Sequence, residues 1–144
     1  MQANNEDKHF LLSFLPIVSG VMSALGTAFL LLPLVKYIFS KFFDFYLFAA
    51  PPSEEWRGNF TIQATLFGWF FISSLVGGFF CMIVSRNRDI IQVLVSSTVS
   101  IGLFMIVTKT DLSFERLFTW LLVLAIPLGN FVGAWLASGY KKKG

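Results

Sequence analysis

The chain contains four long apolar runs, and none of them holds a charged side chain. They cover residues 10–35, 62–84, 90–107 and 117–138. Since an α-helix rises about 1.5 Å per residue, about 20 residues are enough to cross the hydrocarbon core of a bilayer, which is about 30 Å thick. The pattern therefore predicts an all-α polytopic membrane protein with four transmembrane helices, in which residues 1–144 form a single integral membrane domain.

The composition agrees with a membrane location. Hydrophobic residues make up 56% of the chain and charged residues only 13%, whereas about 25% of a soluble domain is charged. The formal net charge of +3 comes from residues outside the four runs, and no basic stripe with interleaved aromatic residues accompanies it. The expected partner is therefore the lipid bilayer and not nucleic acid. Cys81 is the only cysteine, which excludes an intramolecular disulfide and metal sites built from several cysteines.

The connection from Lys36 to Thr61 is the longest and is not an ordinary polar loop. Four of its aromatic residues share one face at helical spacing, namely Phe39, Phe42, Phe43 and Tyr46. Such a face predicts an interfacial aromatic helix between the first two spans, lying at the level of the lipid headgroups. The alternative is that the first span continues and leaves the membrane later. The sequence leaves both interpretations open.

The lysines and arginines give the expected orientation. With four spans, both termini and the turn at 85–89 share one side of the membrane with six basic residues: Lys8, Arg86, Arg88, Lys141, Lys142 and Lys143. The other side holds five: Lys36, Lys41, Arg57, Lys109 and Arg116. Because five of the six lie in short segments next to spans, where the positive-inside rule is strongest, we expect both termini in the cytoplasm. We expect a bacterial inner membrane. The C-terminal lysines resemble a dilysine retrieval signal, so the endoplasmic reticulum membrane is the alternative.

Small residues recur at helical spacing in the runs. Ala125, Gly129, Gly133 and Ala137 are four apart in the last run, and Gly77 and Gly78 are neighbours in the second. Within lipid, close backbone approach at small residues is a main source of helix association. We therefore predict that these six residues form helix-packing surfaces. Whether they pack within the chain or against another chain stays open.

A few polar residues lie inside the runs and form a possible polar path. They are Asn130, the only amide in the last run, and three hydroxyls of the third run, Ser96, Ser97 and Ser100. Pro127 removes one backbone hydrogen bond next to Asn130, and a broken helix beside an amide is able to coordinate a ligand. The alternative is a kinked packing helix, with serine hydroxyls that bond to carbonyls of their own helix.

Asp, Glu, Lys, Arg and His are absent from all four runs, and His9 is the only histidine. Proton- and sodium-coupled transport usually needs such a group within the membrane, and hydrolysis needs a nucleophile with a base or a metal. We therefore predict no catalytic, cofactor-binding or metal-binding residue and no enzyme. The expected function is helix packing, as an accessory or assembly subunit bound to another membrane protein, or as a homo-oligomer. The alternative is a small oligomeric transporter, flippase or channel without an intramembrane titratable residue.

Overall fold

The computed structural model describes residues 5–43, 60–85, 90–107 and 116–141. Within these ranges the chain forms four α-helices, which are α1 (Asn5–Phe43), α3 (Phe60–Val84), α4 (Ile90–Val107) and α5 (Arg116–Lys141). Away from proline, a helix bonds its interior peptide groups within the segment, which suits a chain in lipid, where water is not present to do so. The all-helical fold expected from the sequence is confirmed.

Three helical segments are long and apolar enough to cross a membrane. They are Phe14–Ile38 in α1, Gln63–Val84 in α3 and Val123–Tyr140 in α5. In α4 the apolar segment Ile90–Ile106 is shorter. The membrane character of the protein follows from these three segments, whereas the fourth predicted span is not confirmed.

The first helix is longer than the predicted span 10–35. It runs on to Phe43 with Pro16 and Pro33 inside it. Lys36 and Lys41 are exposed, and exposed lysines do not interrupt backbone hydrogen bonding, so no new helix begins at Lys36. A separate interfacial helix is not confirmed, and its predicted continuation, residues 44–59, lies outside the described residues.

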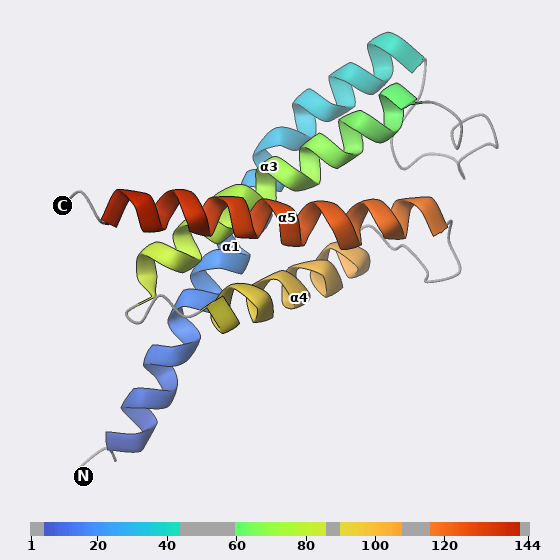
Figure 1. Ribbon diagram of the computed structural model, residues 1–144. Helices are drawn as coiled ribbons and strands as arrows, with labels where there is room; N and C mark the ends of the chain where they lie inside the picture. Colours follow the sequence, from blue (N-terminus) through green and yellow to red (C-terminus); the bar gives the residue numbers. More distant parts are fainter. Residues whose placement is uncertain (1–4, 44–59, 86–89, 108–115, 142–144) are drawn as a thin grey trace.

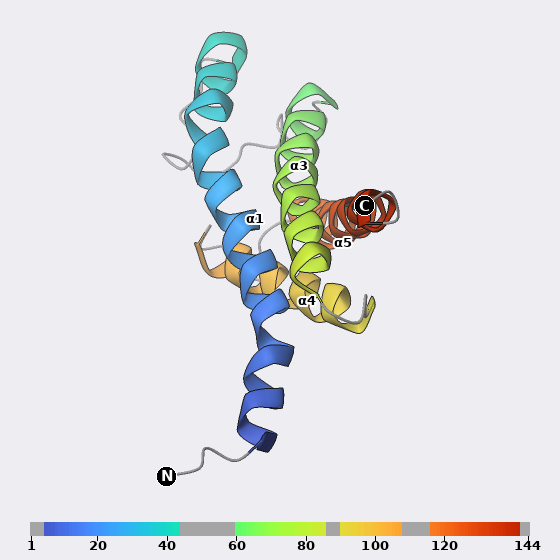
Figure 2. The same cartoon turned by 90° about the vertical axis from the view of Figure 1, so that its left-hand side faces the viewer.

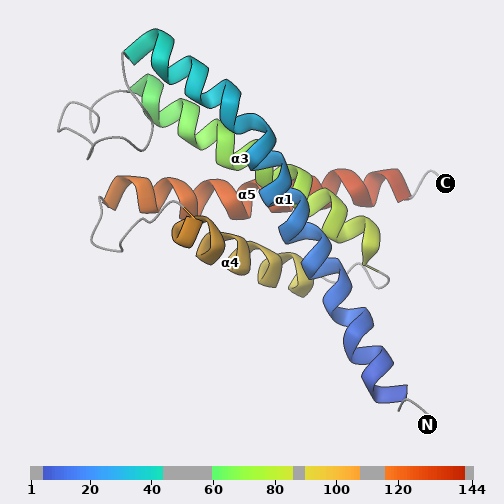
Figure 3. The same cartoon turned by 180° about the vertical axis from the view of Figure 1, so that it is seen from behind.

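The other helices pack around α3. In Figure 1, α1 and α3 run side by side in opposite directions, and α4 and α5 also run in opposite directions. Figure 2 shows α3 between α1 and α5, and its most extensive contacts are with these two helices. The start of α1, the end of α3, the start of α4 and the end of α5 lie toward one side of the molecule, as Figures 1 and 3 show.

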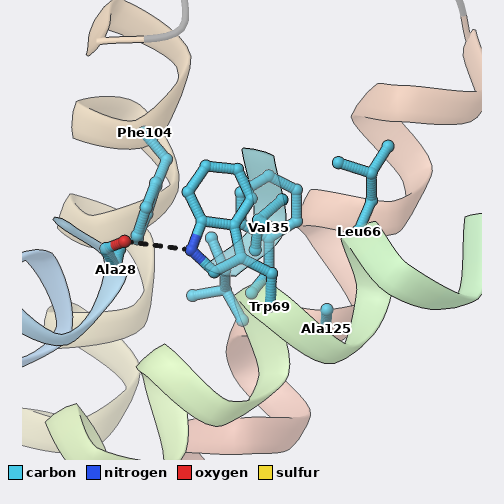
Figure 4. Packing of buried hydrophobic residues seen from close by; sticks show 8 residues of the cluster. Ala28, Val35, Leu66, Trp69, Phe104 and Ala125 are labelled. Atoms are coloured by element: carbon cyan, nitrogen blue, oxygen red, sulfur yellow. Dashed lines mark hydrogen bonds between the residues drawn. The ribbon is translucent and has the colours of Figure 1, made fainter. Parts of the chain in front are cut away.

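One apolar core lies toward the side where α3 begins. This aromatic cluster consists of Ala28, Val35, Leu66, Trp69, Phe70, Phe104, Ala125 and Ile126. The Trp69 indole donates a hydrogen bond of 3.1 Å to the carbonyl oxygen of Ala28, and so joins α3 to α1 (Figure 4). Phe70 and Phe104 meet edge to face, with ring centroids 5.5 Å apart, a favoured geometry for aromatic pairs.

A second apolar core lies toward the other end of α3. This thiol cluster consists of Cys81, Met82, Val93, Ala134 and Ala137. It joins the end of α3 to the start of α4 and the last turns of α5.

The exposed surface is apolar, while several buried side chains are polar. Large hydrophobic side chains point outward on every described helix, for example Met22, Leu30, Ile72, Ile106 and Trp135. A soluble domain with such a surface would aggregate, whereas lipid chains solvate it well. The distribution fits a protein whose outer faces meet a bilayer.

Candidate functional site: a polar layer where the helices cross

Glycines of α5 pack directly onto the backbone of α3. A Cβ placed on Gly129 would touch the carbonyl oxygen of Phe71, and one on Gly133 would touch that of Leu75. Phe71 and Leu75 are four apart, as are the two glycines, so the contact repeats after one helical turn. Such an approach brings Cα–H groups within reach of carbonyl oxygens, a weak bond typical of close helix packing.

The two adjacent glycines of α3 contact different helices. A Cβ on Gly78 would touch the carbonyl oxygen of Asn130 on α5. A Cβ on Gly77 would lie 2.7 Å from the carbonyl oxygen of Gly20 and 2.8 Å from Cβ of Ala24, both on α1. Because side chains at successive helical positions point about 100° apart, a Gly-Gly pair lets one helix touch two others at the same height.

The four small residues of the last run all lie inside the protein. Ala125, Gly129, Gly133 and Ala137 are buried. Gly129 and Gly133 contact α3, while Ala125 belongs to the aromatic cluster and Ala137 to the thiol cluster. This stripe is therefore occupied by contacts within the chain and is not open to a second protein.

Asn130 presents its amide to the point where three helices meet. Its side chain is 0% exposed, and Oδ1 lies 3.4 Å from the position that a Cβ of Gly77 would take. Neither Nδ2 nor Oδ1 has a hydrogen-bond partner in the described part of the chain. A buried polar group left in this way costs about 1–3 kcal/mol.

The serine hydroxyls divide into two groups. Ser73 donates to the carbonyl oxygen of Trp69 at 2.7 Å, and Ser97 to that of Val93 at 2.8 Å. Ser97 is therefore satisfied by its own helix. The buried hydroxyls of Ser74 and Ser100 have no hydrogen-bond partner among the residues described.

Ser96 joins α4 to the same region. Its Oγ lies 2.7 Å from the position that a Cβ of Gly20 would take, and Cβ of Cys81 lies 2.8 Å from that position. Ser100 follows Ser96 by one turn and is also fully buried. On α3, Ser74 reaches α5, because its Cβ is 2.9 Å from the position of a Gly129 Cβ. We call Ser74, Ser96, Ser100 and Asn130 the polar layer.

The polar layer separates the two apolar cores. On α3 the order is Trp69 and Phe70, then Ser74, then Cys81; on α5 it is Ile126, then Asn130, then Ala134. On α4 the order is Val93 of the thiol cluster, the two serines, then Phe104 of the aromatic cluster. The aromatic cluster therefore closes the layer on one side and the thiol cluster on the other.

Of the predicted path residues, the structure brings Asn130, Ser96 and Ser100 into this layer, whereas Ser97 bonds within α4. Sequence reasoning did not single out Ser74, which has the same spacing to a glycine as its neighbour Ser73. In the ranges that the structure describes, no three His, Cys, Asp or Glu side chains gather as a metal site would require. The arrangement offers neutral hydrogen-bonding groups only.

Comparisons of the chain with protein-family models, with curated proteins and with solved structures find no match.

Proposed function

We propose that this chain is a small integral membrane protein that acts through helix contacts, as an accessory or assembly subunit or as a homo-oligomer, and not as an enzyme. In this proposal all four helices cross a bacterial inner membrane and both termini are cytoplasmic; the endoplasmic reticulum membrane is the alternative. The grouping of the helix ends on two sides supports the alternating path. The basic residues in short segments next to the spans support the orientation with both termini in the cytoplasm.

The end of α1 belongs to the same topology. Lys36, Tyr37 and Lys41 are exposed there. Lysine and tyrosine favour the headgroup level of a bilayer. We infer that the last turns of α1 lie at the headgroup level. This is the level at which the sequence predicts an interfacial aromatic segment.

The observation that carries the functional proposal is a pair of outward glycines. Gly26 on α1 and Gly102 on α4 are exposed, and no atom lies within 4 Å of the position that a Cβ would take on either. Glycine costs a helix about 0.8–1.0 kcal/mol relative to alanine. Packing within the chain does not offset this cost, whereas a second helix docked at an outward glycine would.

The neighbouring side chains make each glycine a notch in an apolar face. Met22 and Leu30 flank Gly26 at a distance of four residues, and Thr98 and Ile106 flank Gly102 in the same way; all four are exposed. Thr98 already donates to the carbonyl oxygen of Leu94 at 3.1 Å, so its hydroxyl adds no unmet polar group to the face. Either notch would accept an apolar transmembrane helix.

The test is the mass of the protein and its partners in native-like nanodiscs, measured for wild type and for Gly26→Leu and Gly102→Leu. We expect wild type in an assembly, with itself or with another membrane protein, and at least one variant released as a monomer. The matched control is Val132→Leu, an outward position on α5, which should keep the assembly. A monomeric wild type, or assemblies unchanged in both glycine variants, would contradict the proposal.

A second candidate is the small oligomeric transporter, flippase or channel. The polar layer favours it, because neutral hydrogen-bonding groups at the centre of an apolar bundle resemble a binding site at the middle of a membrane. Since the two apolar cores close the layer, transport through it would require one core to open. Pro127 of α5, which follows Ile126 of the aromatic cluster, is a place where that helix lacks a backbone hydrogen bond.

A further inference from the structure

The polar layer leaves several hydrogen-bonding capacities unused within the described protein. Asn130 has two N–H donors on Nδ2 and an acceptor in Oδ1, and neither atom has a partner. The hydroxyls of Ser74 and Ser100 each add one donor and an acceptor that no described group meets. Native proteins rarely leave so many buried polar atoms together without a ligand or an ordered water.

The chemistry of these groups restricts what binds there. A cation would be met by Oδ1 and the hydroxyl oxygens but would leave the N–H groups of Asn130 without an acceptor, and an anion would leave Oδ1 without a donor. The described residues of the layer carry no charge that would compensate either ion. The ligand must therefore be neutral and must donate as well as accept hydrogen bonds.

The close helix contacts restrict its size. The carbonyl oxygen of Gly77 lies 3.0 Å from the position of a Gly20 Cβ, so α1 and α3 nearly touch beside the layer. Gly78 touches the backbone of Asn130 on the other face of α3. No ligand fits between backbones in such contact, so a ligand of the layer must be small enough to lie among its side chains.

We propose that the polar layer is a hydration site, in which water bonds to the Asn130 amide and to the hydroxyls of Ser74 and Ser100 between two dry apolar cores. This inference is independent of both proposed functions, because a subunit and a transporter would hold the water alike. Buried waters typically make about three hydrogen bonds to otherwise unsatisfied groups, and the Asn130 amide and the two hydroxyls are three such groups.

Water-edited solid-state NMR tests the proposal on the full chain in deuterated lipid bilayers, with ¹⁵N-labelled asparagine and tryptophan. The Asn130 amide should receive magnetisation from water at short mixing times. The Trp69 indole N–H is the internal control, because it is buried in the aromatic cluster and bonded to Ala28, and it should respond late. Equal, slow transfer to both N–H groups would overturn the proposal.

Three further samples keep the result unambiguous. A variant with Asn4, Asn5, Asn59 and Asn87 replaced by glutamine leaves Asn130 as the only asparagine in the chain, and so assigns its side-chain amide without changing it. The double variant Ser74→Ala, Ser100→Ala should delay the transfer to Asn130, whereas Ser97→Ala, whose hydroxyl bonds to Val93, should not. Transfer that is unaffected by the double variant would show that the layer does not hold the water, and would also overturn the proposal.

Discussion

Gly78 of α3 lies directly against the backbone of Asn130 of α5. A Cβ on Gly78 would come within 2.5 Å of the Asn130 Cα and 2.6 Å of its carbonyl carbon. The amide of the same residue reaches toward Gly77, the next glycine along α3. Both glycines therefore lie against Asn130, Gly78 at its backbone and Gly77 near its amide oxygen, so a shift of α5 along α3 would move the amide within the polar layer.

We expect Gly78→Ala to destabilise the protein by about 1–3 kcal/mol, the usual cost of overpacking. The added methyl group meets backbone atoms, which cannot rotate away as a flexible side chain would. Cys81 supplies the measurement, because it is the only cysteine and is fully buried. Maleimide labelling of its thiol during a temperature ramp should begin at a lower temperature in the variant than in wild type.

The matched control is Gly68→Ala on the same helix. No atom lies within 4 Å of the position that a Cβ of Gly68 would take, and alanine forms helices better than glycine. Its labelling curve should equal that of wild type or move to higher temperature. Identical curves for the two alanine variants would show that the α3–α5 contact does not limit stability.

The hydrogen bond from Trp69 to Ala28 gives a second prediction. Trp69→Phe keeps an aromatic ring beside Phe70 but removes the indole donor and leaves the Ala28 carbonyl oxygen without its side-chain partner. We expect a loss of about 0.5–1.5 kcal/mol, the net value of one such bond. Denaturation in a mixed-micelle SDS titration, followed by circular dichroism, measures it.

Trp135→Phe serves as the control for that titration. Trp135 is 72% exposed on α5, so its replacement by phenylalanine changes a lipid-facing side chain only. Its midpoint should match wild type. If Trp135→Phe lowered the midpoint as much as Trp69→Phe, the loss of stability would come from removing any indole ring and not from the hydrogen bond between α3 and α1.

The sequence predicted the helices closely, because their ends depend on local features. The predicted run 90–107 coincides with α4, and 62–84 differs from α3 only at its start. The length of the first helix was underestimated. The apolar pattern stops at Lys36, whereas the helical backbone hydrogen bonds continue to Phe43.

The sequence did not distinguish among the hydroxyls. Ser73 and Ser74 are neighbours of equal type, as are Ser96 and Ser97, yet one of each pair bonds within its helix and the other enters the polar layer. That difference depends on how each helix is rotated toward its neighbours. This rotation is set by contacts between helices, such as those of Gly77 and Gly78. Such contacts cannot be derived from the spacing of residues in a single sequence.

The proposed crossing of the membrane by α4 leads to a topology prediction. On a Cys81→Ser background, we expect Lys109→Cys to react with a membrane-impermeant maleimide in intact cells. Asn87→Cys should react only after the cells are permeabilised. The reason is that the proposed span between the two positions places them on opposite sides, with Asn87 in the basic cytoplasmic turn. Labelling of both from outside, or of neither, would show that α4 does not cross.

The last prediction tests the transport candidate. It compares serines whose hydroxyls face the polar layer with a serine whose hydroxyl bonds within its own helix. In liposomes with purified protein, osmotic swelling in a panel of small neutral polar solutes measures flux. If the polar layer is a path, Asn130→Ala and Ser100→Ala should change the rate severalfold, because they remove groups that face the layer. Ser97→Ala should leave the rate unchanged, since its hydroxyl already bonds to the Val93 carbonyl oxygen. Rates that equal those of protein-free liposomes would remove the transport candidate. A rate changed by Ser97→Ala as much as by Asn130→Ala would mean that solute does not pass along this layer.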